Sequence, residues 1–378
     1  MKERLRTLDR RRVAWVESVG RRWRALPRTW RWAGGLAGIV LLYLLPIIRP
    51  PFITTPDADF DSVLFYPVAV YVLVAIGLNI VVGYAGLLDL GYVAFFAVGA
   101  YSVAAFGAQG PEWPWLAIVP IGVALAMLSG VILGSPTLRL RGDYLAIVTL
   151  GFGEIVRIIA RNTDSLGGPN GITGLPRPPS IGPLEFNVLD SIPYYWLALT
   201  VIIMVIIVVK RLEVSRVGRA WTAIREDEDA AELMGVPTFQ YKLWAFALGA
   251  AVGGLAGTLY GAYTPSIAPE TFRLLLSILF LAAVVLGGAG NLPGVILGAV
   301  LVAYLPERFR NFQEWRVFAF GVALVVMMIF RPQGLLPSKQ RQAEAMEPQR
   351  QPDFPGLAGA DLEESIDPML APQKEGHV

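Results

Sequence analysis

Polar and charged side chains within apolar segments are the residues of this chain best placed to do chemistry. Asp89, Glu154 and Arg157 lie in long apolar runs, and Asn79 stands next to a glycine-rich break. Charged groups at membrane depth are rare because they are costly to remove from water, and they commonly mark solute pathways. Glu154 and Arg157 are spaced i, i+3, which places them on one face of a helix. These four residues are therefore candidates for a polar translocation path.

Three of these candidates also have a purely structural interpretation. Glu154 and Arg157 are equally suited to an ion pair near the outer end of their segment. Asp89 is equally suited to a hydrogen-bonding role where a helix breaks. Residue types and spacing alone leave both interpretations open.

The residue types that most enzymes and metal sites use are nearly absent. The sequence has no cysteine and one histidine, His377. These counts exclude disulfides, thiolate metal sites and most histidine-based acid–base chemistry, and no carboxylate pair has a recognisable catalytic spacing. We expect no catalytic residue, no metal site and no cofactor in this chain. The net charge of +2 gives no reason to expect a nucleic-acid partner.

A short charged stretch in the middle of the chain suggests protein recognition instead. Six of the eight residues from Arg225 to Glu232 are charged, and apolar runs flank them. Gly235 as a C-cap and Pro237 as a stop predict one short helix that ends here. The helix is either a solvated connection between two spans or a handle for another protein.

Long apolar runs must position all of these residues. The chain is 54% hydrophobic and 16% charged, whereas soluble proteins carry about 25% charged residues. Because a span needs about 20 apolar residues, we predict an all-α polytopic membrane protein with about ten transmembrane helices, some of them broken or re-entrant. The segments are 33–48, 65–82, 86–108, 115–134, 143–160, 194–209, 241–263, 272–288, 293–306 and 316–330. The run 86–108 contains Asp89 and 293–306 is short, so these two are the candidates for broken elements.

Basic residues predict the sidedness of the spans. Residues 1–32 hold 11 Lys or Arg and three acidic residues, so we expect a cytoplasmic arm that lies along the inner membrane surface in contact with lipid. Alternation then places loop 162–193 outside and loop 211–240 inside. The arginines near residue 310 would face outward, which the charge rule disfavours.

The distribution of basic, apolar and proline residues along the chain predicts three regions. Residues 33–330 form the membrane domain between the basic arm and the C-terminal segment. Residues 331–378 are rich in proline and poor in aromatic residues, which predicts a disordered cytoplasmic tail.

Glycine recurs at four-residue intervals in two places. This spacing puts small residues near one helix face, where they let two backbones approach closely. The residues are Gly249, Gly253, Gly257 and Gly261, and then Gly290, Gly294 and Gly298. We predict tight helix packing; a sliding surface or a contact with a second membrane subunit is the alternative. Residues 81–91 and 285–294 also share a G-x-x-G break, which hints at an internal repeat.

Four long stretches carry a family resemblance. Residues 77–101, 137–158, 217–236 and 284–299 resemble LivM-type branched-chain amino-acid permeases of ABC importers, in the family's order and over most of residues 65–305. Asp229-Ala230-Ala231, followed after three residues by Gly235, is similar to the EAA-x3-G loop of ABC permeases, with Asp in place of Glu.

The resemblance implies an ABC importer permease-like bundle in a bacterial inner membrane, with both termini cytoplasmic. It implies a LivH-like second permease, two ABC ATPase subunits and an extracytoplasmic solute-binding protein as partners. Loop 211–240 would then hold the coupling helix that docks on an ATPase. The coupling residues so implied are Arg219, Ala223, Arg225, Glu226, Asp229, Ala230, Ala231 and Gly235.

The lysines agree with an ATPase on separate chains. A P-loop requires Gly-Lys followed by Ser or Thr, and none of the five lysines follows a glycine. ATP would therefore bind partner subunits. An ion-coupled secondary transporter that uses Asp89 and Glu154 is the alternative, and a membrane enzyme is the weakest hypothesis. Dependence on a partner ATPase discriminates among them.

Overall fold

The computed structural model describes most of the membrane domain and little beyond it. The described residues are 27–50, 59–110, 112–138, 143–180, 182, 185–187, 190–308, 318, 321, 322, 325 and 334–336. The predictions for the basic arm before residue 27 and for the tail after residue 336 lie outside them. So does nearly all of the predicted segment 316–330.

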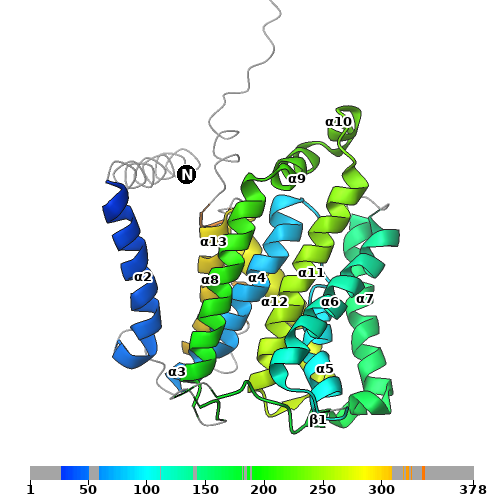
Figure 1. Ribbon diagram of the computed structural model, residues 1–378. Coiled ribbons are helices and arrows are strands. Elements are labelled where there is room, and N and C mark those ends of the chain that lie inside the picture. The colour runs from blue at the N-terminus through cyan, green and yellow to red at the C-terminus, as the bar shows by residue number, and fades with distance from the viewer. Residues whose placement is uncertain are drawn as a thin grey trace, which may run out of the picture. The chain divides into compact units, whose positions relative to one another are not determined.

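Helices make up most of the described chain (Figure 1). The first half contains α2 (Arg28–Ile48), α3 (Phe60–Val63), η1 (Leu64–Ala69), α4 (Val70–Leu78), η2 (Asn79–Tyr84), α5 (Val93–Gly107), α6 (Trp115–Thr137), α7 (Asp143–Asn162), η3 (Asp164–Leu166), η4 (Gly168–Asn170) and strand β1 (Ile172–Thr173). The second half contains α8 (Ile192–Val214), α9 (Arg216–Glu226), α10 (Glu228–Leu233), α11 (Thr238–Tyr263), strand β2 (Ser266–Ile267), η5 (Pro269–Phe272), α12 (Leu274–Gly287) and α13 (Leu292–Arg308).

Two short strands are the exception to the predicted all-α fold. Ile172 pairs with Ile267 and Thr173 with Ser266, in antiparallel register. This ladder joins the loop after α7 to the loop after α11. Sequence periodicity does not reveal it, because two residues are too few to show an alternating pattern.

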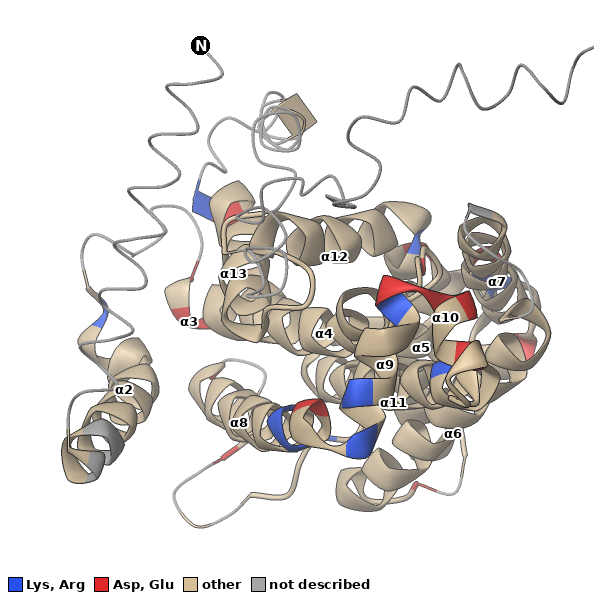
Figure 2. Ribbon diagram, turned by 90° about the horizontal axis from the view of Figure 1, so that it is seen from above, with Lys and Arg blue, Asp and Glu red and all other residues tan. Residues whose placement is uncertain are grey.

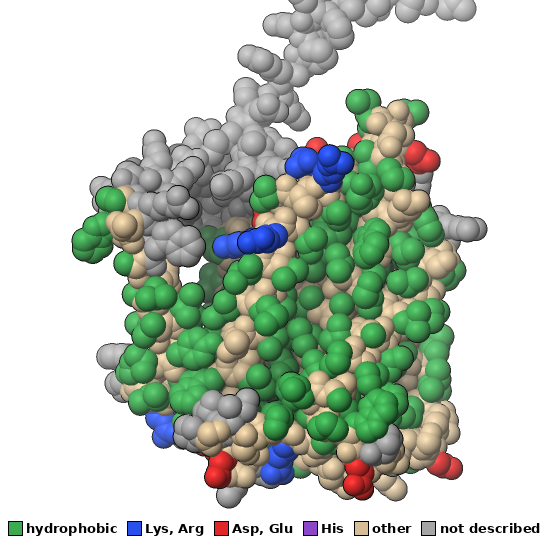
Figure 3. Space-filling view, viewed as in Figure 1, with side chains coloured by type: hydrophobic (Ala, Val, Ile, Leu, Met, Phe, Trp, Pro, Cys, Tyr) green, Lys and Arg blue, Asp and Glu red, His purple; other side chains and the backbone are tan. Residues whose placement is uncertain are grey.

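Four helices in the described residues are long and apolar enough to cross a membrane: Phe60–Tyr84, Trp115–Thr137, Ile192–Val214 and Thr238–Tyr263. Shorter apolar helices cover Ala33–Ile48, Val93–Gly107 and Leu274–Gly287. On the face shown in Figure 3, hydrophobic side chains cover the middle, and charged side chains gather toward the two ends. This banding suits a protein surrounded by lipid. The further crossings stay predictions.

The predicted segment 86–108 is broken in the structure. Residues 85–92 are not helical, and α5 begins only at Val93. The Leu90 amide donates to Thr149 Oγ1 on α7 at 3.0 Å, and Ser277 Oγ on α12 donates to the Leu90 carbonyl at 2.6 Å. Irregular backbone is tolerated among apolar helices when protein groups satisfy it in this way. The other candidate, 293–306, belongs to the continuous helix α13.

Helix α11 packs against α6, α5 and α4. Its glycines permit this. A Cβ added to Gly257 would lie 2.1 Å from the Phe96 carbonyl oxygen, and one added to Gly249 would lie 2.5 Å from the Val81 side chain. Gly253 and Gly261 face side chains of α5 or of the residue just before it. The glycine spacing therefore lets α11 approach its neighbours closely.

Helices α12 and α13 form a second close pair. Gly294 and Gly298 both lie against Gly287 of α12. Gly290 differs from the other six glycines, because it lies in the turn between the two helices with φ of +85°. The sequence spacing placed it on a helix face, but its conformation belongs to a turn that favours glycine.

Residues 334–336 also belong to this part of the fold. The Leu335 amide donates to the Leu286 carbonyl at 2.8 Å, and the Leu336 amide donates to the Gly287 carbonyl at 3.1 Å. The Asn291 side chain donates to the Leu336 carbonyl at 2.8 Å. Residues 334–336 were predicted to lie within the disordered tail, but Leu335 and Leu336 form backbone hydrogen bonds with the end of α12.

Candidate functional site

The charged stretch forms two helices rather than the one that was predicted. Ser215 Oγ accepts the Val217 amide at 3.2 Å and caps α9. Asp227 then leaves the helical conformation and its side chain accepts the Ala230 amide at 2.9 Å, which starts α10. Aspartate is a strong N-cap, so the same residue that looked like helix interior begins a second helix.

Gly235 ends α10 as the sequence predicted. Its φ is +84°, its amide donates to the Glu232 carbonyl, and the Val236 amide donates to the Ala231 carbonyl. These two bonds define the Schellman C-cap, which favours glycine at the left-handed position.

The pair α9–α10, called the coupling segment from here on, lies across one end of the bundle over α11 (Figures 1 and 2). Two contacts fasten it there. Trp221 is buried, and its Nε1 donates to the Tyr241 carbonyl of α11 at 2.7 Å. Lys242 of α11 is buried and forms an ion pair with Glu228 of α10. A buried charge needs such a partner, so α10 is held firmly at its base.

The outer surface of the coupling segment combines apolar and acidic groups. Leu233 and Met234 at the end of α10 are 89% and 85% exposed. Among the residues assigned to coupling by resemblance, the exposed ones are Arg219, Glu226, Asp229, Ala230 and Gly235; Ala223 and Arg225 are half-buried and Ala231 is buried. Two neighbouring large apolar side chains with this exposure are suited to burial against another protein.

Arg225 points into the bundle. Its Nη1 donates to the Gly83 carbonyl, in η2, at 2.5 Å. A Cβ added to Gly290 would lie 2.6 Å from the same Nη1. Asn79 Oδ1 in turn accepts the Gly290 amide at 2.8 Å. We call Arg225, Gly83, Gly290 and Asn79 the arginine junction; it brings together the two glycine-rich breaks that the sequence suggested were repeats.

Asn79 and Asp89 are both fully buried near the breaks. Asp89 Oδ1 accepts the Gly91 amide at 2.9 Å. Within the described residues, Asp89 Oδ2 and Asn79 Nδ2 have no hydrogen-bond partner. Asp89 therefore organises the irregular segment 85–92 and retains the capacity for one more polar contact.

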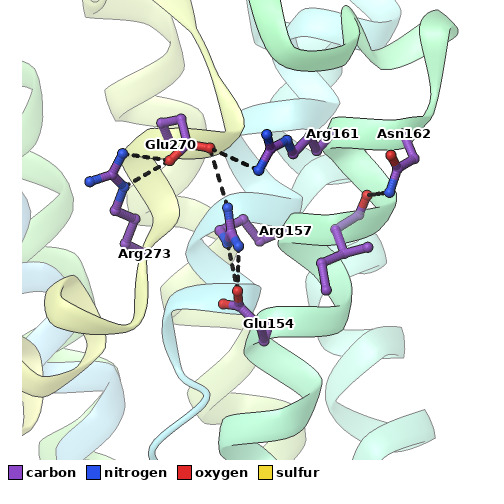
Figure 4. Close-up of polar contacts among 7 residues, drawn as sticks. Glu154, Arg157, Arg161, Asn162, Glu270 and Arg273 are labelled. Atoms are coloured by element: carbon purple, nitrogen blue, oxygen red, sulfur yellow. Dashed lines mark hydrogen bonds and ion pairs between the residues drawn. The ribbon is translucent and has the colours of Figure 1, made fainter.

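Glu154 and Arg157 lie elsewhere, in an ion-pair network between α7 and η5 (Figure 4). Arg157 Nε donates to Glu154 Oε1 at 3.0 Å, and Arg157 Nη1 donates to Glu270 Oε1 at 3.3 Å. Arg161 also approaches Glu270 Oε1, at 3.7 Å, and Arg273 Nε donates to Glu270 Oε2 at 2.8 Å. The hydrogen bond from Arg273 and the neighbouring arginine charges hold the pKa of Glu270 below its ordinary value.

The four candidates for a translocation path thus do not form one cluster. Arg157 pairs with Glu154 on α7 and contacts Glu270 in η5, whereas Asn79 contacts the α12–α13 turn. Sequence reasoning missed Glu270 and Arg273, although their i, i+3 spacing in a short connection was a visible signal. Among the described residues, no group of three or more acidic or histidine side chains could hold a metal ion.

Comparison with known proteins identifies the family. The sequence model for the permease component of branched-chain amino acid transport systems matches residues 62–331. The chain belongs to this family. The matched residues include the coupling segment and the arginine junction. No solved structure matches the chain.

Relatives within the family extend this similarity. The high-affinity branched-chain amino acid transport system permease protein LivM of Escherichia coli (strain K12) is 40% identical over 80% of this chain and 75% of its own length. A probable LivM permease of Methanocaldococcus jannaschii is 26% identical over 74% of this chain and 94% of its own length. The permease LivH of Salmonella typhimurium is also 26% identical, over 70% of this chain and 91% of its own length.

Proposed function

We propose that this chain is the transmembrane permease subunit of a binding-protein-dependent ABC importer for branched-chain or related amino acids. Family membership and the names of the relatives support the solute class. The observation that carries the assignment is the coupling segment, which is fastened to the bundle at its base and presents two exposed apolar residues at its tip. The comparisons give the ion-coupled alternative no support.

Energy for transport comes from separate subunits in this proposal. The sequence has no P-loop, so ATP binds and is hydrolysed on two partner ATPases. Leu233 and Met234 enter the ATPase surface, and the exposed acids of α10 surround that contact. Movement of the ATPases then displaces the coupling segment and the helices attached to it.

The remaining assignments follow from the same proposal. A LivH-like permease completes the pathway, since this chain resembles both LivM and LivH proteins. The chain crosses the bacterial inner membrane about ten times with both termini cytoplasmic, and loop 162–193 faces the solute-binding protein. Asn79, Asp89, Glu154 and Arg157 are assigned to the polar path or its ends.

Purification of the complex from its native membrane in mild detergent tests the proposal. Mass spectrometry should recover a P-loop ATPase and a second permease with this chain, and vesicles containing the complex should import leucine only when ATP is supplied to the ATPases. Recovery of the chain alone, with leucine uptake independent of ATP, would contradict the proposal.

A matched pair of variants sharpens the test. Leu233→Asp adds one acid at the exposed tip of α10, and Asn187→Asp adds one acid on the exposed loop before α8. Recovery of the ATPase should fall at least about tenfold for the first, because a charge would be buried in the contact, and stay at the wild-type level for the second. Equal recovery of the ATPase with both variants would show that α10 does not contact the ATPase.

A further inference from the structure

Arg225 and Arg219 both lie in α9 and both donate to a backbone carbonyl, but they reach different parts of the molecule. Arg219 is exposed, and its Nη1 donates at 3.0 Å to the carbonyl of Val214, the last residue of α8. Arg225 is half-buried and reaches a carbonyl 142 residues away in sequence. The resemblance assigned Arg225 to ATPase coupling, and its side chain leads from the coupling segment into the membrane bundle.

The space around the Arg225 side chain is shaped by glycine. A Cβ on Gly86 would lie 2.5 Å from Arg225 Cγ, and one on Gly290 would lie 2.6 Å from Arg225 Nη1. Both glycines have left-handed backbone, with φ of +73° and +85°. Gly86, in the irregular segment 85–92, therefore lies against the aliphatic part of the Arg225 side chain, and Gly290, in the α12–α13 turn, lies against its guanidinium. Glycine suits both positions because their backbone is left-handed.

The residues that Arg225 contacts are linked by further contacts to several helices. The Asn79 bond to the Gly290 amide ties η2 to the α12–α13 turn. Close contacts of Gly287 with Gly294 and Gly298 join α12 to α13. Ser277 of α12 also holds Leu90 in the irregular segment before α5. These contacts connect Gly83 and Gly290 to α12 and α13 and to the segment that contains Asp89, and η2 continues directly from α4.

We infer that Arg225 is a positioning residue that transmits movement of the coupling segment to these elements through the arginine junction. The inference rests on the proposed function and adds a route to it. In the proposed function Leu233 and Met234 contact the ATPase, whereas Arg225 contacts the bundle, so recruitment of the ATPase and transmission of its movement through the arginine junction use different residues. The planar guanidinium suits the task, because its fixed donors hold the carbonyl in one direction.

Arg225→Gln tests this division in the complete complex. We expect the ATPase to co-purify with the variant at wild-type stoichiometry and to hydrolyse ATP within about twofold of the wild-type rate, because Leu233 and Met234 remain in place. Leucine imported per ATP hydrolysed should fall at least about tenfold. Arg225→Lys keeps the positive charge but not the planar, multiple-donor guanidinium. It should restore part of the ratio of leucine imported to ATP hydrolysed.

A reporter on α13 separates transmission from mere stability. The chain has no cysteine, so Leu297→Cys on the exposed face of α13 gives a single labelling site. A spin label there should show an ATP-dependent change that is present in an otherwise wild-type chain and absent with Arg225→Gln. Arg216→Gln, an exposed arginine at the start of the same helix, is the control and should leave both the signal and the coupling ratio unchanged.

Three results would overturn the inference. The first is loss of the ATPase together with transport in Arg225→Gln, which would make Arg225 a docking residue. The second is an unchanged coupling ratio in that variant. The third is an ATP-dependent signal at residue 297 that persists without Arg225. A wild-type complex that yields no ATPase at all would instead contradict the proposed function.

Discussion

Glu270 shows how single residues organise the end of the bundle that carries the β1–β2 ladder. Arg157, Arg161 and Arg273 all approach its carboxylate, and they come from α7 and from the position just before α12 (Figure 4). The network joins two elements that are distant in sequence. Its members are half-exposed, apart from Arg157, so each pair contributes little to stability on its own.

Lowering the pH should weaken this network, because Glu270 loses its charge when it is protonated. The hydrogen bond from Arg273, with the neighbouring arginine charges, lowers the pKa of Glu270 in the folded protein. Its stabilising contribution is therefore complete above the unfolded-state pKa, about 4.3, and is lost as the pH falls through the lower folded-state pKa. We expect Glu270→Gln to lower the Tm at pH 6 and to have less effect at about pH 3.5.

Thermal unfolding in detergent at both pH values measures this difference. Glu185→Gln, on the exposed loop before α8, is the control for removing one carboxylate from the same surface. If the difference in Tm between the wild-type protein and Glu270→Gln stayed constant with pH, the charge on Glu270 would not contribute to the stability of this contact.

At the scale of elements, glycine decides how closely the helices approach. Gly257 lies against the Phe96 carbonyl, and Gly298 lies against Ala283 and Gly287. Small residues matter here because helices in lipid gain little from burying apolar area and must associate by close packing. The spacing of the glycines was visible in the sequence; the partner of each was not.

Alanine substitutions at two helical glycines should therefore have opposite effects. The Cβ of Gly257→Ala would overlap the Phe96 carbonyl, so we expect a loss of about 1–3 kcal/mol in the free energy of unfolding. Gly151→Ala on α7 meets no atom within 4 Å, so we expect no loss and a gain of up to about 1 kcal/mol from the better helix former. Denaturant unfolding in the same detergent measures both, and equal effects would show that the α11 contact is not tight.

At the scale of the whole molecule, charged side chains gather toward the two ends of the face shown in Figure 3, and apolar side chains cover its middle. The coupling segment lies at one end of the bundle, and the β1–β2 ladder lies at the other (Figure 1). An ATPase can reach only the cytoplasmic end. The proposed function therefore commits the coupling segment to the cytoplasm and the ladder to the outside.

Cysteine labelling tests this orientation directly, because the natural chain has no cysteine. A membrane-impermeant maleimide should label Asn187→Cys in intact spheroplasts. Leu233→Cys, in a chain expressed without the ATPase that would cover it, should react only after the membrane is permeabilised, because its exposed side chain faces the cytoplasm. Labelling of Leu233→Cys in intact spheroplasts would show that the coupling segment faces outward, which would exclude its contact with a cytoplasmic ATPase.

Features that depend on neighbouring residues could be predicted from the sequence alone. Apolar runs place α4, α6, α8 and α11, because hydropathy over about 20 residues decides whether a helix suits a membrane. Gly235 ends α10 as predicted, since a C-cap depends on a few adjacent residues. Asp227 is the local feature that was misjudged: its type is typical both of a charged helix and of an N-cap, and the cap is what forms.

Contacts between distant segments required the tertiary structure. The sequence places Arg225 in a charged, solvent-facing stretch, and only the approach of η2 and the α12–α13 turn directs it inward. Glu270 gains two of its three arginines from a helix more than 100 residues earlier. Such pairings depend on how helices pack, and helix packing is decided by shape complementarity along whole helices rather than by any local pattern.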